Sequence, residues 1–212
     1  MQETKQKSRR EQYLEEKRHK RELAELSDED LIFRFQDGDI HAFEEIVNRY
    51  KDPLMNFVYR FLGDMSEAED IVQETFLRVF RNKKAYKKIA KFSTWIYTIA
   101  GNLAKTELRK RKKRNVYSIS DMGYEDKDYE ISDESMNPEQ KTNTRMFDEV
   151  LQKEIEKLSP KFREVIILRD IQELSYEEIS KILKIPLGTV KSRVNRARLR
   201  LQEQLKDVLD RK

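Results

Sequence analysis

Polar side chains that can hydrogen-bond to the edges of nucleic-acid bases are concentrated near the C-terminus, between residues 187 and 201. One side of this segment is apolar at helical spacing and predicts a buried seam formed by Val190, Val194, Ala197 and Leu201. The opposite face carries Ser192, Asn195, Arg196 and Leu199, with Lys191 and Arg193 at its edges. A helix that packs on one side and presents such groups on the other suits the major groove of duplex DNA.

A shorter helix immediately before this segment has to hold it in position. Ser175 can cap that helix, and Glu178 can complete a capping box three residues later. Its buried stripe is predicted to consist of Ile179, Ile182 and Leu183. Pro186 presets the backbone dihedral that starts the second helix. The pattern predicts a helix-turn-helix, and the alternative is an ordinary helical hairpin with a solvated basic face.

Aromatic and basic side chains are mixed between residues 82 and 114. The segment NKKAYKKIAK (82–91) predicts a loop or irregular turn, and FSTWIYTIAGNLAKTELRKRKKR (92–114) predicts a helix that ends in an unbroken basic run. Rings that stack on bases beside cations that follow phosphates are typical of single-strand binding. Aromatic residues at helical spacing usually lie in a core, and so we expect most of these rings, Trp95 and Tyr97 included, to be partly buried.

The segment DIVQETFLRVF (70–80) predicts an amphipathic helix with two separate stripes. Residues 66–69 are predicted to form a capping box at the N-terminus of this helix. The apolar stripe, expected to be buried together, consists of Val72, Phe76, Val79 and Phe80. The other stripe consists of Asp70, Gln73, Glu74 and Leu77, which are three and four residues apart. A polar stripe is usually a solvated face, and the alternative is a docking site for a basic partner helix.

The composition indicates a mostly helical protein. Of 212 residues, 40% are charged and 37% hydrophobic, and five glycines and four prolines are few for a β-rich fold. The lack of cysteine excludes disulfides, thiolate zinc sites and thiol catalysis. The N-terminus is charged and no apolar run approaches membrane-spanning length. We therefore expect a cytoplasmic protein without membrane insertion or a secretory signal.

Charge and periodicity divide the chain into four parts. Residues 1–25 form a charged extension, which is expected to be a solvated or partly helical tail. Residues 26–114 form a first helical domain, in which Ser27 caps one helix and a long helix with Pro53 inside it ends at Gly63. Residues 115–145 form an acidic linker. Residues 146–212 form a second helical domain that contains the helix-turn-helix.

Three motifs together resemble the extracytoplasmic-function (ECF) class of bacterial sigma factors. They are DIVQETF (70–76), FSTWIYTIAGN (92–102), and Leu158-x-Pro-x-x-x-Arg163 followed by LSYEEI (174–179) and GTVKSRVxRAR (188–198). Their order and separation cover about residues 26 to 205. The resemblance implies an all-α fold, with a sigma2-like bundle and a sigma4-like helix-turn-helix joined by the acidic linker.

The same resemblance implies a sigma subunit that confers promoter recognition on core RNA polymerase and has no catalysis or cofactor of its own. The stripe of Asp70, Gln73, Glu74 and Leu77 would dock on the coiled coil of the largest polymerase subunit. The melted minus-ten element, with one base flipped into a pocket, would be engaged by Tyr86, Lys87, Lys88, Trp95 and Asn102. Its phosphates would be followed by Lys105 and the basic run that includes Arg109 and Arg111.

The duplex minus-thirty-five element would be read by Lys191, Ser192 and Arg196, together with Arg193 and Asn195 on the same helix. Arg169 matches a family position that holds the DNA backbone. The implied partners are core polymerase, duplex and single-stranded promoter DNA and an anti-sigma factor, and the free chain is expected to be a monomer. Two segments depart from the family pattern: residues 86–89 (YKKI) replace a common Phe-Arg-Gly-Asp, and Gly101 replaces the Arg that commonly precedes the pocket Asn.

Two other classes of function are compatible with parts of the sequence. A classical regulator with an effector domain accounts for residues 175–201, but it leaves the aromatic-basic helix and the DIVQETF stripe unexplained. An enzyme acting on nucleic acid needs a nucleophile or a metal cluster. With only His19 and His41, no cysteine and no glycine-rich phosphate loop, neither can be assembled. Among 40 acidic residues, chance proximity is enough to explain a pair of carboxylates spaced for Mg²⁺.

Overall fold

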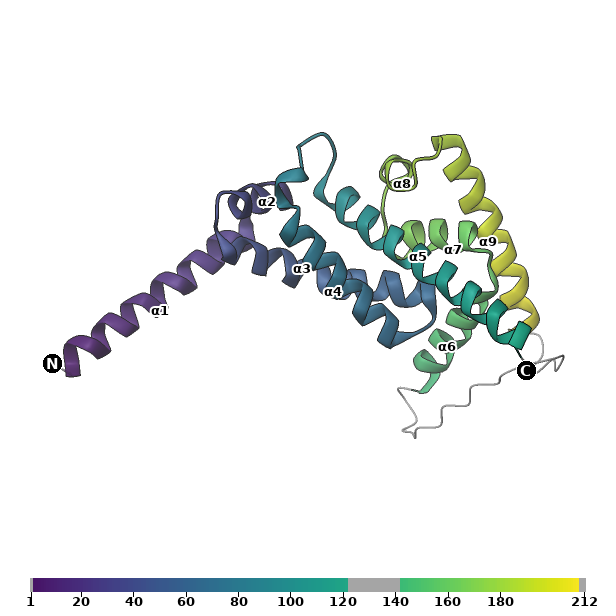
Figure 1. Cartoon of the computed structure of the whole chain (residues 1–212), viewed down its shortest axis with the longest axis horizontal. Coiled ribbons are helices and arrows are strands. Elements are labelled where there is room, and N and C mark those ends of the chain that lie inside the picture. The colour runs from purple at the N-terminus through teal and green to yellow at the C-terminus, as the bar shows by residue number, and fades with distance from the viewer. Residues whose placement is uncertain (1, 122–141, 210–212) are drawn as a thin grey trace.

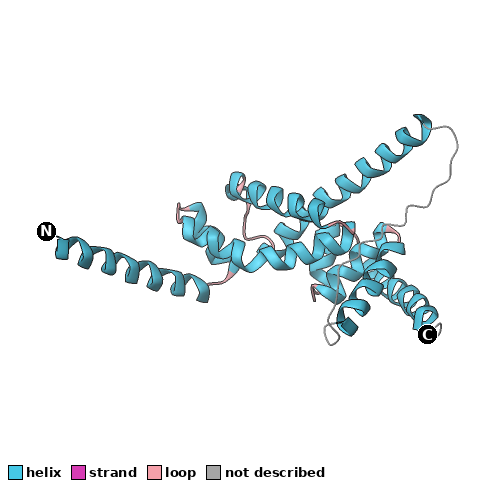
Figure 2. Ribbon diagram, turned by 90° about the horizontal axis from the view of Figure 1, so that it is seen from below, coloured by secondary structure: helices cyan, strands magenta, loops and turns pink. Residues whose placement is uncertain are grey.

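The computed structural model describes residues 2–121 and 142–209, with side chains described for 14–114 and 147–206. Those ranges contain helices and loops and no strand, as Figure 1 and Figure 2 show, which confirms the all-α prediction. The elements are α1 (Gln2–Glu25), α2 (Asp28–Gln36), α3 (Ile40–Leu62), α4 (Met65–Arg81), a 3-10 turn η1 (Lys83–Ala85), α5 (Phe92–Asp121), α6 (Thr142–Lys157), α7 (Pro160–Ile166), a π-helical turn η2 (Ile167–Ile171), α8 (Tyr176–Leu183) and α9 (Leu187–Leu209). No helix in the described part of the chain is both long enough and apolar enough to span a membrane.

Helices α2 to α5 form the first domain, and their ends follow local sequence signals. Ser27 caps α2 by accepting a hydrogen bond from the Asp30 backbone N–H, as predicted. Helix α3 runs through Pro53 and ends at Gly63, whose φ of 76° is the left-handed conformation that favours glycine. The predicted capping box at residues 66–69 is wrong. Asp64 caps α4 instead, accepting from the Glu67 N–H at 2.8 Å, because this earlier carboxylate lets the helix begin at Met65.

The core of the first domain is rich in phenylalanine. Phe35, Phe57, Phe61 and Phe92 are fully buried. On α4, Val72 and Val79 are buried as predicted and Phe76 is partly buried, but Phe80 is 45% exposed. The expectation for Phe80 was therefore wrong: its ring packs 5.3 Å from both Phe35 and Phe43 at the edge of the core, with one side left open.

The charged extension is a helix, α1, and its C-terminal end is tied to the first domain. Leu23 is only 1% exposed and joins the core. Arg49 donates to the carbonyl oxygens of Leu23 and Ala24, and Arg34 forms an ion pair with Glu22 at 2.7 Å. The expectation of a solvated tail is wrong for this last turn, because Leu23 is buried and two arginines from α2 and α3 bond to it.

Helices α6 to α9 form the second domain. Pro160 starts α7 directly after Ser159. Helix α6 begins at Thr142, ahead of residue 146 at which the second domain was predicted to begin, and Phe147 in this helix is 53% exposed. Helix α5 continues past Arg114 to Asp121, so that both helices extend into the segment predicted as a linker, most of which (122–141) lies outside the described residues.

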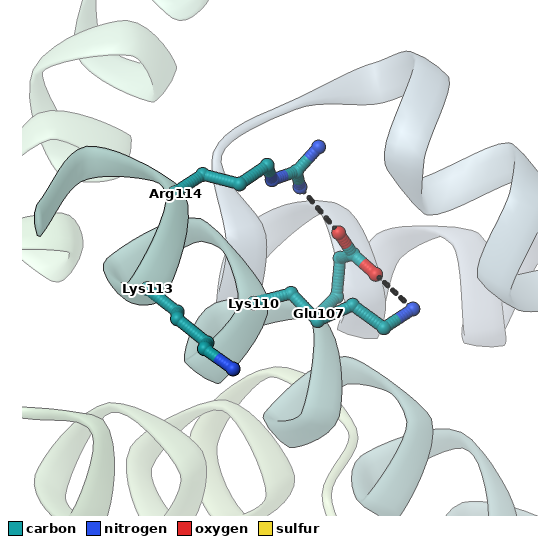
Figure 3. Close-up of a pocket in the computed structure, with 4 residues that line it drawn as sticks. All are labelled: Glu107, Lys110, Lys113 and Arg114. Carbon is teal, nitrogen blue, oxygen red and sulfur yellow. Dashed lines mark hydrogen bonds and ion pairs between the residues drawn. The ribbon is translucent and has the colours of Figure 1, made fainter. Parts of the chain in front are cut away.

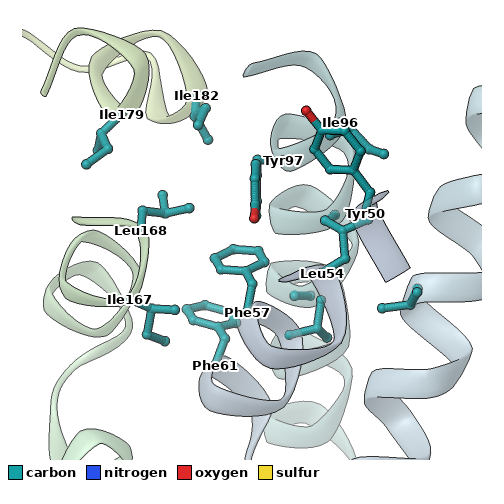
Figure 4. Packing of buried hydrophobic residues seen from close by; sticks show 14 of the residues in the cluster. Tyr50, Leu54, Phe57, Phe61, Ile96, Tyr97, Ile167, Leu168, Ile179 and Ile182 are labelled. Carbon is teal, nitrogen blue, oxygen red and sulfur yellow. The ribbon is translucent and has the colours of Figure 1, made fainter. Parts of the chain in front are cut away.

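The two domains share one hydrophobic core. From the first domain, Tyr50, Phe57, Phe61 and Tyr97 turn toward Ile167, Leu168, Ile179 and Ile182 of the second, as Figure 4 shows. Helix α5 lies against α8, and α3 lies against α6, α7 and η2. In the described structure the second domain is therefore packed directly on the first.

Candidate nucleic-acid interface

The helix-turn-helix has the division of faces that the sequence predicts. The seam of Val190, Val194, Ala197 and Leu201 is at most 8% exposed. Lys191, Ser192, Asn195 and Arg196 are exposed, and Arg193 is half-buried. The capping box of α8 is present: the Ser175 N–H donates to Glu178 Oε2 at 2.9 Å, and the Glu178 N–H donates to Ser175 Oγ at 3.2 Å. Burial opposes ionisation of Glu178, but hydrogen bonds that its carboxylate accepts from the Ser175 hydroxyl and backbone N–H, together with the Lys91 ammonium at 3.1 Å, outweigh it and hold the pKa of Glu178 below its ordinary value.

Two cationic side chains at the edge of this surface lie close to the ring of Tyr176, the first residue of α8. The Arg169 guanidinium lies 4.7 Å from the centre of its ring and the Lys191 ammonium 5.9 Å from it. Arg169 also donates to the Leu174 carbonyl oxygen at 2.8 Å, which fixes its direction. Sequence reasoning missed Tyr176, although its place directly after the Ser175 cap was a signal that its ring faces the turn.

The turn η2 is clamped to the recognition helix by a bidentate ion pair. Arg198 donates through Nε and Nη2 to the two carboxylate oxygens of Asp170, at 2.9 and 2.5 Å. These hydrogen bonds raise the pKa of Arg198. The pair ties the middle of α9 to η2.

The loop between α4 and α5 places its tyrosine inside and its lysines outside. Tyr86 is 4% exposed, donates from its hydroxyl to the Ala90 carbonyl oxygen at 2.8 Å, and packs against Phe33, Phe92 and Trp95. Burial raises its pKa to about 12. Lys87 and Lys88 are exposed, and Ile89 between the lysines and Ala90 is 85% exposed. In this structure Tyr86 supports the loop from below rather than presenting its ring to a base.

Helix α5 carries the remaining residues that were predicted to follow the melted strand. Trp95 is half-buried, with its ring 5.5 Å from Tyr86, and Asn102 is exposed. Lys105 forms an ion pair with Glu164 of α7 at 3.1 Å. Arg111 turns inward, donating to Glu67 at 2.7 Å and to the Leu62 carbonyl oxygen at 2.9 Å, so that it joins α5 to the ends of α3 and α4.

One acidic residue sits within the basic end of α5. Glu107 accepts hydrogen bonds from Lys110 at 3.1 Å and Arg114 at 2.7 Å, and Lys113 lies beside them, as Figure 3 shows. Arg109 is exposed. Glu107 holds two of the cations along one side of the helix.

The stripe on α4 faces solvent. Asp70 and Gln73 are exposed, Leu77 is 46% exposed, and Glu74 is half-buried and bonded to Arg78 at 2.8 Å. Beside the stripe is an open groove of about 330 Å³, lined by Phe43, Val47, Gln73, Phe76, Leu77 and Phe80. An apolar groove edged by amide and carboxylate groups suits a helix with both apolar and basic side chains. The described residues hold no group of three or more His, Asp or Glu side chains arranged for a metal ion.

Comparisons with known proteins agree with this arrangement. The family model Sigma-70 region 2 matches residues 46–114, and Sigma-70, region 4, matches residues 148–201. The ECF RNA polymerase sigma factor SigW of Bacillus subtilis is 40% identical over 179 residues, which are 84% of this chain and 96% of SigW. RNA polymerase sigma-H factor of Pseudomonas aeruginosa is 32% identical, covering 88% of this chain and 98% of that protein.

A solved structure extends the likeness to three dimensions. The sigma factor RpoE of Bartonella quintana, crystallised with the anti-sigma factor NepR, is 30% identical and superposes with a TM-score of 0.62 over 77% of this chain and 96% of RpoE. Sequence motifs, helical architecture and these matches agree. The chain belongs to the ECF family of RNA polymerase sigma factors.

Proposed function

We propose that this sigma factor binds core RNA polymerase through α4 and reads a promoter at two places, with α9 on the duplex upstream element and the 86–105 region on the melted downstream strand. Membership of the family makes it a non-enzymatic factor for promoter-specific transcription initiation. The observation that carries the residue assignment is the exposure of both polar surfaces. Recognition residues on α9 and the α4 stripe face solvent although the apolar sides of both helices are buried.

The recognition helix supports direct reading of bases. Arg196 and Asn195 are exposed and can each form paired hydrogen bonds with a base edge, whereas Lys191 and Arg193 at the edges suit phosphates. Arg169, held by Leu174 and Tyr176, is positioned to contact the DNA backbone. We assign specificity to the centre of the face and affinity to its edges.

On the downstream side, we propose that exposed Lys87, Lys88 and Asn102 contact the opened strand and that half-buried Trp95 offers one face of its ring for stacking. Tyr86 acts here as a positioning residue, because its buried hydroxyl closes the loop on the Ala90 carbonyl. Arg109 follows phosphates, and Arg111 orients the helix from which Arg109 projects.

We further propose that the chain acts in the cytoplasm and that an anti-sigma factor controls it, as the complex of the Bartonella quintana protein with NepR suggests. Such a partner competes with polymerase if it covers the α4 groove. A pull-down with core polymerase, repeated in the presence of a candidate partner, distinguishes competition from simultaneous binding.

Run-off transcription with purified core polymerase tests the proposal. The chain should give a promoter-dependent transcript only when core enzyme is present. Leu77→Ala removes an exposed leucine from the proposed docking stripe and should weaken core binding about tenfold, since burying a leucine at an interface contributes about 1.5 kcal/mol. Leu14→Ala, at a leucine that is 55% exposed on α1, is the matched control. Tight binding to duplex DNA without any transcript from a matched core enzyme would favour a classical regulator instead.

A further inference from the structure

The loop between η1 and α5 holds an isoleucine in solvent. Ile89 is 85% exposed, whereas Leu199, the next most exposed large hydrophobic side chain among the described residues, is 58% exposed. In Figure 1 the segment between α4 and α5 rises above the helices as an open loop. Isolated apolar side chains are common on protein surfaces, and exposure alone assigns no role. The backbone and the charges around Ile89 supply the further evidence.

Hydrogen bonds fix both ends of this loop. The Gln36 side chain of α2 donates to the Tyr86 carbonyl oxygen at 3.1 Å, and the Tyr86 hydroxyl donates to the Ala90 carbonyl oxygen at 2.8 Å. On the far side, the Phe92 N–H donates to a glutamate carboxylate of α2 at 2.8 Å. Residues 87–89 are therefore a short tip that stands on a fixed base.

The tip itself is a tight turn. The Ile89 N–H donates to the Lys87 carbonyl oxygen at 2.6 Å, which closes a three-residue turn around Lys88. The branched Cβ of isoleucine also restricts the rotation of its side chain. An apolar group held in this way loses little conformational freedom when it enters a binding partner.

Cations surround the apolar tip in the sequence. Lys84, Lys87 and Lys88 are exposed, and Lys91 pairs with Glu178 of α8 while its side chain remains 70% exposed. Residues 82–91 include no acid. Nucleic acid satisfies both kinds of group, because phosphates bind the cations and base faces cover the apolar side chain. An apolar protein surface would leave the lysines without a counter-charge.

A stacking surface lies next to the loop. Trp95, which is proposed above to stack on a base of the opened strand, has its ring 5.5 Å from that of Tyr86. Separating a base from its neighbour in a duplex is unfavourable, and proteins that unstack DNA insert apolar side chains such as isoleucine between the bases. The loop thus places an apolar tip close to a ring that can receive the released base.

We propose that Ile89 is a wedge that enters the base stack at the upstream junction between paired and opened promoter DNA, where it replaces the stacking that the last base pair loses. This inference rests on the proposed function, and it adds a residue that opens the duplex to those that hold the opened strand. Lys87 and Lys88 bind the phosphates beside the wedge. Ile89 belongs to the segment YKKI (86–89), which departs from the family pattern, and the wedge is therefore a feature of this chain.

Opening of a fully paired promoter tests the wedge. Holoenzyme with Ile89→Ala should open this promoter about tenfold more slowly than the wild-type holoenzyme, because alanine covers too little of the exposed base to offset unstacking. Permanganate reactivity of unpaired thymines measures the rate. Ile40→Ala, at a 45% exposed isoleucine of α3, is the matched control and should leave the rate unchanged. Equal opening rates for Ile89→Ala and the wild-type chain would overturn the proposal.

A promoter that is already mismatched across its minus-ten element separates opening from capture. Ile89→Ala should bind and transcribe this promoter as well as the wild-type chain does, because no stacked pair remains to be opened. Asn102→Ala, which removes a proposed contact with the opened strand, should stay defective on it. A defect of Ile89→Ala that persists on the mismatched promoter would assign Ile89 to strand capture and contradict the wedge.

Two side chains of similar size distinguish apolar contact from shape. Ile89→Leu keeps an aliphatic side chain and should retain most of the opening rate, whereas Ile89→Asn should open the paired promoter as slowly as Ile89→Ala. At an 85% exposed position neither change should alter unfolding in urea. If Ile89→Asn opens the promoter as fast as the wild-type chain, apolar insertion is not the mechanism.

A single thiol locates the tip in the complex. The chain has no cysteine, and so Ile89→Cys can carry a photoreactive label that is attached before the holoenzyme is assembled. Irradiation of the open complex should join the label to bases at the upstream junction, and the same label on Ile40→Cys should not reach them. Crosslinks from Ile89→Cys to polymerase alone would indicate a protein contact and overturn the wedge.

The wedge and the proposed function fail on different results. If the wild-type chain gives no promoter-dependent transcript with core polymerase, the proposed function is wrong. If it gives that transcript and Ile89→Ala opens the paired promoter normally, only the wedge is wrong.

Discussion

Arg163 joins three helices through main-chain carbonyl groups, and its removal is the most informative single perturbation of the second domain. The guanidinium donates to the Phe61 carbonyl oxygen at 2.7 Å, to that of Leu158 at 3.3 Å and to that of Glu156. These carbonyls lie at the C-terminal ends of α3 and α6, where a helix offers no N–H of its own. The residue is 9% exposed, and burial lowers the pKa of its guanidinium. The chain therefore retains a buried cation as a donor to three acceptors.

The cost of Arg163→Ala follows from those acceptors. Each buried carbonyl left without a donor costs about 1 to 3 kcal/mol, and water that enters the vacated space recovers part of it. We expect Arg163→Ala to lower the free energy of unfolding by about 3 kcal/mol. Arg163→Lys keeps the positive charge but replaces the planar guanidinium and its several N–H donors with one ammonium group. About half of the decrease in the free energy of unfolding should therefore remain.

Urea unfolding followed by far-ultraviolet circular dichroism measures these changes. Lys161→Ala, at an exposed position of the same helix, should change the free energy of unfolding by less than about 0.5 kcal/mol. If Arg163→Ala unfolds at the same urea concentration as the wild-type chain, the three carbonyls have other donors and the assigned role of Arg163 is incorrect. If Arg163→Lys has the same free energy of unfolding as the wild-type chain, the positive charge alone is sufficient and the planar geometry of the guanidinium is not required.

Three further predictions concern the helix-turn-helix and the buried carboxyl group of Glu164. Ser175→Ala removes the capping box of α8 and should cost about 1 kcal/mol in urea unfolding, with Ser175→Asp restoring most of it; no loss would mean that Glu178 alone holds this helix end. Arg196→Ala should weaken binding to the cognate upstream duplex by about 1 to 3 kcal/mol in a titration of the polymerase holoenzyme, and equal weakening on unrelated duplexes would reassign Arg196 to phosphate contact. Burial raises the pKa of Glu164, so the folded chain binds a proton at this carboxyl more tightly than the unfolded chain does, and this group adds to the free energy of unfolding as pH falls through the raised pKa. Urea unfolding of the wild-type chain and of Glu164→Gln at several pH values measures this contribution, and an identical pH dependence in both chains would contradict it.

Local signals predicted most of the helices because caps and periodicity act over a few residues. The seam from Val190 to Leu201 and the Ser175 capping box are confirmed, since each depends only on neighbours in the chain. The start of α4 was predicted wrongly because two acceptable caps, Asp64 and Ser66, stand two residues apart and sequence alone does not rank them. Leu23 was missed for a related reason: one leucine in a charged segment has no periodic partner to indicate that it is buried.

The candidate site was predictable in its residue types but not in its contacts. The exposed face of α9 follows from helical spacing, whereas the inward turn of Tyr86 does not, because a loop has no period that separates inside from outside. Arg111 belongs to a uniform basic run, and only the positions of Glu67 and Leu62 distinguish it from its neighbours. Pairs such as Lys105 with Glu164 join distant parts of the chain and depend on how two domains meet, which no local pattern encodes.

Gly101 shows how a departure from a family pattern can carry structural information. A Cβ atom at this position would lie 3.1 Å from Glu164 Oε1 and 3.8 Å from Phe57 Cζ, so the Glu164 side chain would have to shift to admit the common arginine. Glycine lowers the helix propensity at this position, but its lack of a side chain leaves room for the contact between the two domains. An arginine here would therefore require the Glu164 carboxylate, the end of a flexible side chain, to move before the same packing could form. The residue that precedes Asn102 thus influences how closely α7 can approach α5.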